Sequence, residues 1–181
     1  MRREEFEHVL RASAAIVDDE LVVIGSQAVL AQFPNAPDAL LRSLEVDVFP
    51  RRDPDRAAEI DGAIGDGSRF HDTYDYYAHG VGPETVIAPA GWEDRLVKLE
   101  VPATGSKDRT VVAWCLEVHD LVLAKLAAGR PHDLEFAEEA IRSGLVDPEQ
   151  LDLGLQLMPD RHLGVTRDRL VGAIGRSRPS D

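Results

Sequence analysis

A continuous apolar run, Leu21-Val22-Val23-Ile24, places the strongest constraint on the fold, because it presents no polar side to solvent. A strand of this kind is typical of a sheet that is covered on both faces. The run ends at Gly25-Ser26, and residues 27–33 then read as a short helix that Ser26 can cap and Pro34 stops. We therefore predict a buried central strand, a tight glycine turn and a helix.

A second strand is indicated by alternating apolar and acidic residues from Leu44 to Phe49, closed by Pro50. Residues two apart on a strand point to the same side, so Glu45 and Asp47 share one face while the valines between and after them enter the core. Like charges at this spacing repel, and a divalent cation held between them removes the repulsion. The strand therefore predicts a metal site.

The remaining periodicity indicates one compact unit of strands and helices, since 181 residues suffice for a single domain. We expect residues 1–116 to form the core and residues 117–181 a helical part packed on it. Helices are expected at residues 3–17, 54–61, 118–128, 132–143, 148–157 and 166–175, and further strands at residues 74–79, 95–101 and 110–116, the last two forming an antiparallel hairpin.

The charge balance restricts the possible partners. The chain has 20 Lys and Arg against 33 Asp and Glu, a formal charge of −13, which opposes nonspecific binding to nucleic acid and to anionic membranes. A polyanionic substrate would need a local basic patch, for which Arg51, Arg52 and Arg56 are candidates. The single cysteine, Cys115, excludes an internal disulfide and a thiolate zinc cluster and fits a reducing compartment, so we expect a cytoplasmic protein.

No apolar run approaches the roughly 20 residues that a membrane helix needs, so no membrane partner is expected. The N-terminal residues lead into an amphipathic pattern rather than into the apolar core of a signal peptide. The sequence therefore predicts a protein that neither spans a membrane nor is exported.

The turn at Gly25-Ser26 lies at one end of the predicted sheet, where backbone N–H groups and the positive end of a helix favour phosphate. A phosphate cradle beside paired carboxylates is the minimal equipment for in-line phosphoryl or nucleotidyl transfer. In such reactions two Mg²⁺ ions about 3.5–4 Å apart hold the attacking and leaving oxygens.

These segments resemble the signature of the nucleotidyltransferase superfamily related to DNA polymerase β, which includes the minimal nucleotidyltransferases. That signature is an apolar residue, Gly and Gly or Ser, then a helical spacer and an acidic-apolar-acidic-apolar strand, here Ile24-Gly25-Ser26 and Glu45-Val46-Asp47-Val48. Within the superfamily the chain looks most like the AbiEii-like toxin branch. The residues that carry this closer resemblance, over roughly residues 18–140, are Ser43, Asp120-Leu121, Lys125, Arg130 and Asp133.

The resemblance implies an α/β (α+β) fold with a small mixed sheet flanked by helices and a C-terminal helical cap. It implies nucleotide-binding positions at Gly25, Ser26, Arg42, Ser43, Lys125, Arg130 and Asp133. It also implies that Glu45 and Asp47 ligate Mg²⁺, two ions when NTP is bound. The superfamily has a third acidic group on a neighbouring strand, and we assign it to Glu100, which lies opposite the apolar side of residues 95–101.

The same residues have structural interpretations, and the chain departs from the branch in having Glu at 45 and in placing Arg42 directly before Ser43. The Glu45–Asp47 pair is also typical of a solvated strand face. The alternatives for the other positions are an exposed hairpin charge for Glu100, a helix residue that reaches solvent for Lys125, a cap or ion pair for Arg130 and Asp133, and packing rather than base stacking for Tyr74, Tyr76, Tyr77 and His79.

The implied function is Mg²⁺-dependent transfer of a nucleoside monophosphate from an NTP to an acceptor hydroxyl. The resemblance adds a biological setting: tRNA as the acceptor, and a toxin of a toxin–antitoxin or phage-defence pair with an antitoxin protein as partner. Two alternatives stay open. One is a catalytically silent module that binds a nucleotide or a partner protein, and the other is an enzyme that nucleotidylates a small molecule of the antibiotic type.

Overall fold

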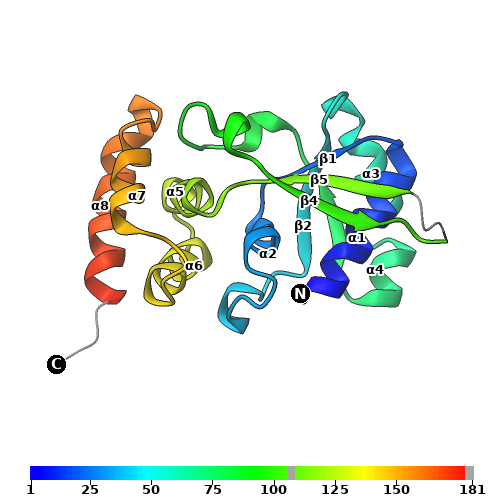
Figure 1. Ribbon diagram of the computed structural model, residues 1–181, viewed down its shortest axis with the longest axis horizontal. Helices are drawn as coiled ribbons and strands as arrows, with labels where there is room; N and C mark the ends of the chain where they lie inside the picture. The colour runs from blue at the N-terminus through cyan, green and yellow to red at the C-terminus, as the bar shows by residue number, and fades with distance from the viewer. Residues whose placement is uncertain (106–108, 178–181) are drawn as a thin grey trace.

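The fold is a five-stranded mixed sheet with helices, seen in a computed structural model that describes residues 1–105 and 109–177 (Figure 1). Its strands are β1 (Leu21–Val23), β2 (Glu45–Pro50), β3 (Tyr77–Gly80), β4 (Val97–Pro102) and β5 (Thr110–Cys115), in the order β3-β2-β1-β5-β4. β1 is the central strand and all three of its residues are buried, as its apolar run predicts. It pairs antiparallel with β2 and parallel with β5.

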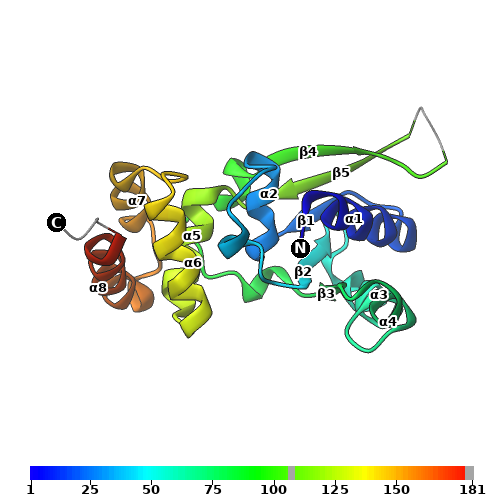
Figure 2. The same ribbon diagram turned by 90° about the horizontal axis from the view of Figure 1, so that it is seen from below.

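One face of the sheet is covered by α1 (Arg3–Val17) and α3 (Ala57–Ile64), and the short α4 (Arg69–Tyr74) lies beside α3 (Figure 2). The apolar stripe of α1 supplies Phe6, Val9 and Leu10 to the same buried cluster as Val46 and Val48 of β2. Each such side chain contributes roughly 1.5–3 kcal/mol when it is fully buried. This burial fixes the opposite orientation for Glu45 and Asp47.

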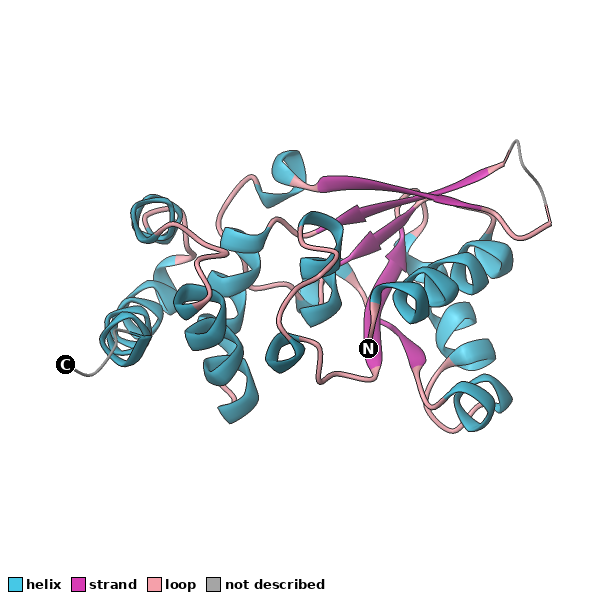
Figure 3. Ribbon diagram, turned by 60° about the horizontal axis from the view of Figure 1, so that its bottom comes forward, coloured by secondary structure: helices cyan, strands magenta, loops and turns pink. Residues whose placement is uncertain are grey.

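The C-terminal part consists of α5 (Val118–Ala128), α6 (Pro131–Arg142), α7 (Pro148–Leu155) and α8 (Asp160–Ser177), which lie together at one end of the molecule (Figures 1 and 3). α5 is in contact with the other three helices and is buried on several sides. It begins where the Glu117 carboxylate accepts hydrogen bonds from the first turn, and it ends at Gly129, whose φ of +70° is left-handed.

The segment after β1 differs in one respect from its prediction. A 3₁₀ turn (Ser26–Ala28) leads into α2 (Val29–Gln32). The N-cap residue of this turn is Gly25, and Ser26 is the first residue of the turn itself. The prediction that Ser26 caps the helix is wrong, because no side-chain hydrogen bond caps this turn and Ala28 N–H donates to the Gly25 carbonyl at 3.0 Å.

The other predicted elements are present in the structure, but the strand predicted at residues 74–79 and the helix predicted at residues 166–175 have different bounds. The strand starts late, because Ser68 accepts a hydrogen bond from His71 N–H and opens α4, which runs to Tyr74. Asp75 then adopts φ 61° and ends the helix, so β3 begins only at Tyr77. α8 begins six residues before the predicted helix at 166.

The predicted fold class, a mixed sheet flanked by helices with a helical C-terminal part, is confirmed. The division at residue 116 stays a prediction, and residues 106–108 of the predicted hairpin tip lie outside the described residues. Within the described ranges, none of the helices combines the length and apolar character needed to cross a membrane.

Candidate active site

Four polar side chains form a two-by-two array on the face of the sheet opposite α1 and α3. β2 and β3 run parallel with Glu45 level with Tyr77 and Asp47 level with His79, and residues in register share a face. The Tyr77 hydroxyl donates to Glu45 Oε2 at 3.1 Å, and His79 Nδ1 lies 2.9 Å from Asp47 Oδ1. Burial and the neighbouring Glu45 raise the pKa of Tyr77 to about 12, so this hydroxyl stays a hydrogen-bond donor at neutral pH.

Three members of this array can hold a metal ion. One ligand atom each from Glu45, Asp47 and His79 lies within 4.8 Å of the others, and the two carboxylates are half-buried while the imidazole is exposed. Gly25 faces the Asp47 carboxylate: a Cβ at position 25 would lie 2.1 Å from Asp47 Oδ2. The missing side chain leaves room for Asp47 at the end of β1. The hydrogen bonds to Tyr77 and His79 use one oxygen of each carboxylate, and carboxylate oxygens suit a divalent cation such as Mg²⁺.

A positively charged group lies on the helical side. Lys125 Nζ is 2.9 Å from Asp133 Oδ1 and Arg130 Nε is 2.7 Å from Asp133 Oδ2, so one carboxylate holds two cations. The left-handed Gly129 ends α5 and Pro131 starts α6, which brings these residues together across a tight turn. The Asp133 side chain is 0% exposed. Burial raises its pKa, but the hydrogen bonds from Arg130 and Lys125 outweigh burial and leave the pKa below its ordinary value.

These two groups face a common pocket of about 250 Å³. Gly25, Asp47 and His79 line it from the sheet, and Lys125 and Arg130 line it from the helices. The apolar part of the lining is Ile24, Val81, Val86, Ile87, Leu121, Ala124 and Ala128. The pKa of Arg130 is raised chiefly by its hydrogen bond to Asp133, with smaller contributions from Asp47 and Glu45. The two walls therefore interact electrostatically across the pocket.

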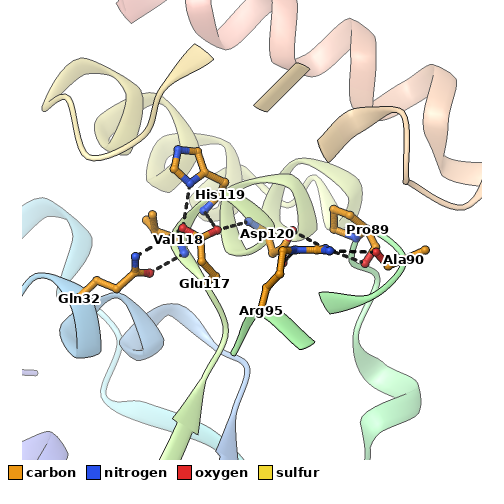
Figure 4. Close-up of polar contacts among 8 residues, drawn as sticks. All are labelled: Gln32, Pro89, Ala90, Arg95, Glu117, Val118, His119 and Asp120. Atoms are coloured by element: carbon orange, nitrogen blue, oxygen red, sulfur yellow. Dashed lines mark hydrogen bonds and ion pairs between the residues drawn. The ribbon is translucent and has the colours of Figure 1, made fainter. Parts of the chain in front are cut away.

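An ion pair between the buried Asp120 and the partly exposed Arg95 supports the segment that forms another side of the pocket (Figure 4). Arg95 donates to both carboxylate oxygens of Asp120, at 2.8 and 3.0 Å, and to the carbonyls of Pro89 and Ala90. Burial raises the pKa of Asp120, although Arg95 opposes the shift. Residues 85–87 line the pocket and lie just before Pro89, so the Arg95–Asp120 pair connects this pocket-lining segment to α5. Asp120 itself does not line the pocket.

A second polar network connects α2 to the start of α5 (Figure 4). Gln32 accepts a hydrogen bond from Val118 N–H at 2.8 Å, and Glu117 accepts one from His119 N–H at 2.8 Å. His119 Nδ1 also lies 2.8 Å from Glu117, and this hydrogen bond is the largest cause that raises the pKa of His119. The helical wall is thereby fixed to the segment that follows β1.

The third predicted carboxylate, Glu100, is not part of this site, and its placement on a strand neighbouring β2 is wrong. β4 is separated from β2 by β1 and β5, which corresponds to about 14 Å across the sheet. Glu100 pairs with Val112 at the far end of the strands, and Lys98 Nζ lies 2.5 Å from its carboxylate. The strand beside Asp47 is instead β3, which presents His79.

The structure divides the other predicted nucleotide-binding residues. Gly25, Lys125 and Arg130 line the pocket with Asp47. Glu45 and Asp133 do not line it: Glu45 lies beside Asp47 on the same face of β2, and Asp133 contacts Lys125 and Arg130. The cap and ion-pair interpretation of Arg130 and Asp133 is confirmed, since Asp133 also accepts from the Arg130 backbone N–H.

Three further predicted positions also lie outside the pocket lining. The Ser43 hydroxyl is 3.2 Å from the Glu45 backbone nitrogen and supports the start of β2. Arg42 pairs with Glu135 on the surface. Ser26 is next to Gly25 but outside the lining residues. A role for these three in nucleotide binding stays a prediction.

Sequence reasoning missed Tyr77 and His79 as parts of the site. Both were grouped with nearby aromatic residues, and their positions two apart on a strand carried the signal. Tyr74 and Tyr76 pack instead against His8 and Phe70, with ring centroids 4.6–5.9 Å apart, which confirms the packing interpretation for that half of the group.

Comparison with known proteins places this chain in a family. Neither the curated proteins nor the solved structures give a match to the chain. A family model described as "Nucleotidyltransferase of unknown function (DUF6036)" matches residues 4–161, which include both walls of the pocket. The chain therefore belongs to this family of nucleotidyltransferases of unknown function.

Proposed function

We propose that the protein is a Mg²⁺-dependent nucleotidyltransferase that transfers a nucleoside monophosphate from an NTP to an acceptor hydroxyl and releases pyrophosphate. The observation that carries the proposal is the pocket, which Asp47 lines on the strand side and Lys125 and Arg130 line on the helix side. A ligand atom of Glu45 lies within 4.8 Å of one from Asp47 and adds a second carboxylate at its edge. A bound triphosphate needs both kinds of charge.

The side chains of the pocket have distinct roles in this reaction. Glu45 and Asp47 would hold the metal, and a bound divalent ion neutralises phosphate charge and activates the attacking oxygen. Lys125 binds phosphate as a point charge and Arg130 as a planar fork. Asp133 is a positioning residue, because it orients both cations from behind. The Tyr77 hydroxyl likewise orients Glu45.

The size of the pocket supports triphosphate binding more than enclosure of a whole nucleotide. Its volume of about 250 Å³ is below the range of roughly 300–1,000 Å³ that is usual for sites enclosing drug-sized ligands. The base and ribose would then lie at the rim, so we expect weak discrimination among the four bases.

For the acceptor we propose tRNA, and for the biological role the toxin of a toxin–antitoxin pair, on the resemblance to AbiEii-like toxins. The three arginines that were candidates for a basic patch are neutralised in the structure, however. Arg51 pairs with Glu20, Arg52 with Asp19 and Arg56 with Glu59. This observation favours a second candidate, an acceptor of low charge such as a small molecule.

The test is incubation of the protein with each α-³²P-labelled NTP, Mg²⁺ and a cell lysate, followed by separation of labelled RNA, protein and small molecules. We expect label in one class, and a loss of more than about 100-fold in Glu45→Gln and Asp47→Asn, since even outer-shell ligand changes cost 10–100-fold. Glu100→Gln is the matched control, because Glu100 is an exposed carboxylate on the same face at the far end of the sheet. Absence of transfer to all three classes would refute the proposal and favour the silent binding module.

A further inference from the structure

We propose that His79 is the third ligand of the metal site and that its imidazole makes the site prefer Mn²⁺ over Mg²⁺. The inference rests on the proposed function, because it concerns the same metal. The residue that β3 places beside Asp47 is His79, which offers a nitrogen ligand, whereas a third carboxylate would offer oxygen.

The spacing of the donor atoms fits a shared ion. Adjacent ligands of an octahedral ion with bonds of about 2.1 Å lie about 3.0 Å apart, by the geometry of a right angle. His79 Nδ1 and Asp47 Oδ1 are separated by 2.9 Å, and a Glu45 oxygen lies within 4.8 Å of both. Two ligands of such an ion lie at most about 4.2 Å apart, so one ion can take all three ligands with at most a small rotation of the Glu45 side chain, without a change in the pairing of β2 and β3.

The two residues that β3 contributes to the array differ in what they offer a metal. The Tyr77 hydroxyl donates its hydrogen to Glu45 Oε2 at 3.1 Å, so it orients that carboxylate. In the structure His79 Nδ1 donates its hydrogen to Asp47 Oδ1 at 2.9 Å, since an ionised carboxylate only accepts. A neutral imidazole carries one N–H, so when an ion replaces this hydrogen bond the proton lies on Nε2 and the lone pair of Nδ1 faces the ion. His79 is half-exposed, so Nε2 can remain hydrated when Nδ1 binds the ion.

The donor set then decides the metal. Carboxylate and water oxygens suit Mg²⁺, which is bound in near-ideal octahedra and loses its water reluctantly, whereas imidazole adds affinity for first-row transition ions. Two carboxylates and one imidazole on adjacent strands therefore favour Mn²⁺, which accepts both oxygen and nitrogen, over Mg²⁺.

The test measures metal binding directly. Purified protein without nucleotide is titrated with Mn²⁺ and followed by electron paramagnetic resonance, with Mg²⁺ as competitor, and a pulsed experiment detects ¹⁴N coupled to the bound Mn²⁺. We expect ¹⁴N coupling in the wild-type protein. In His79→Asp we expect the coupling to disappear and the ratio of Mn²⁺ to Mg²⁺ affinity to fall about tenfold, at the low end of what a change near a metal ligand costs. His162→Asp, on α8, is the matched control and should change neither quantity.

Two results would overturn the inference: no Mn²⁺ binding or ¹⁴N coupling in the wild-type protein, or an unchanged affinity ratio in His79→Asp. Thermal unfolding of each variant shows whether a loss comes from misfolding, and His79→Asn, which introduces no charge, must lose the coupling as well. The nucleotidyl-transfer assay separates this inference from the proposed function. Transfer with Mg²⁺ and no ¹⁴N coupling refutes only the role of His79, whereas coupling without transfer refutes only the enzymatic activity.

Discussion

The strand wall and the helix wall of the pocket carry opposite charge and are compensated differently. On the strand wall, Glu45 and Asp47 have a tyrosine hydroxyl and an imidazole as partners, and neither forms an ion pair with Lys or Arg among the described residues. On the helix wall, the single carboxylate of Asp133 faces two cations. The strand wall therefore has a negative charge that a bound metal ion would balance. The helix wall has two cations for one carboxylate, and its net positive charge favours phosphate.

Burial also differs between the two walls. On the helix wall Asp133 is fully buried and the Lys125 side chain is 11% exposed, while that of Arg130 is 62% exposed; on the strand wall the Asp47 side chain is 25% exposed. A buried ion pair whose partner is removed leaves an uncompensated charge in a medium of low polarity. We therefore expect changes on the helix wall to affect the stability of the fold, and changes on the strand wall to affect ligand binding.

The largest expected effect is that of Asp133→Ala, which leaves Lys125 and Arg130 without their carboxylate. The free energy of unfolding should fall by about 3–5 kcal/mol, the usual cost of breaking a buried pair from one side. Asp47→Ala is the counterpart on the strand wall and should change it by less than about 1 kcal/mol. Urea denaturation of both variants measures the difference. Equal losses would show that the walls do not differ in this way.

Acid should weaken the helix wall. The Asp133 pKa is below its ordinary value, so the stabilisation from its ionised form is present at neutral pH and is lost as the pH falls through the folded-state pKa. The decline should begin below about pH 4, near the ordinary carboxyl pKa. Asp133→Asn lacks this carboxylate, so its unfolding free energy should approach that of the wild-type protein as the pH falls. A constant difference from pH 7 to pH 3 would contradict the assignment.

Gly25→Ala is the sharpest test of the strand wall. The added Cβ would lie 2.1 Å from Asp47 Oδ2, so the carboxylate must turn away or the strands must separate. Overpacking of this kind costs about 1–3 kcal/mol. Gly62→Ala is the matched control: its Cβ meets nothing within 4 Å, and inside α3 it should stabilise the protein by about 0.5–1 kcal/mol. Thermal unfolding and Mn²⁺ titration of both variants decide the case, and equal behaviour of the two would contradict the close approach.

Tyr77→Phe should have a smaller effect and weaken metal binding by about 1 kcal/mol, because it removes one hydrogen bond to the half-buried Glu45 carboxylate. Glu45 would keep its charge but lose the donor that orients it. The expected result is a weaker metal affinity with little change in the unfolding temperature. A loss of stability without any change in metal affinity would show that Tyr77 acts only in packing.

The difference between the walls also decides what the sequence could predict. β1 and β2 follow from local periodicity, and the pairing of Arg130 with Asp133 follows from their spacing around a helix start. The third member of the metal site does not, because its identity depends on which strand pairs with β2. Glu100 has the expected chemistry, but the hairpin joins the sheet through β5, so β3 and His79 take the place beside Asp47. Strand order is a property of the whole fold and is absent from any local pattern.

The smallest expected effect is that of Arg42→Ala, and it tests the boundary of the helix wall. Arg42 was predicted to bind nucleotide, but in the structure it pairs with Glu135 of α6, with side chains 70% and 65% exposed. Exposed pairs contribute about 0–1 kcal/mol and are screened by salt, so stability should change by no more than about 0.5 kcal/mol. NTP affinity, measured by calorimetry, should be unchanged, whereas Lys125→Ala should weaken it at least about tenfold. Comparable losses in the two variants would mean that Arg42 reaches the triphosphate and that the positive wall extends from α6 to the residues before β2.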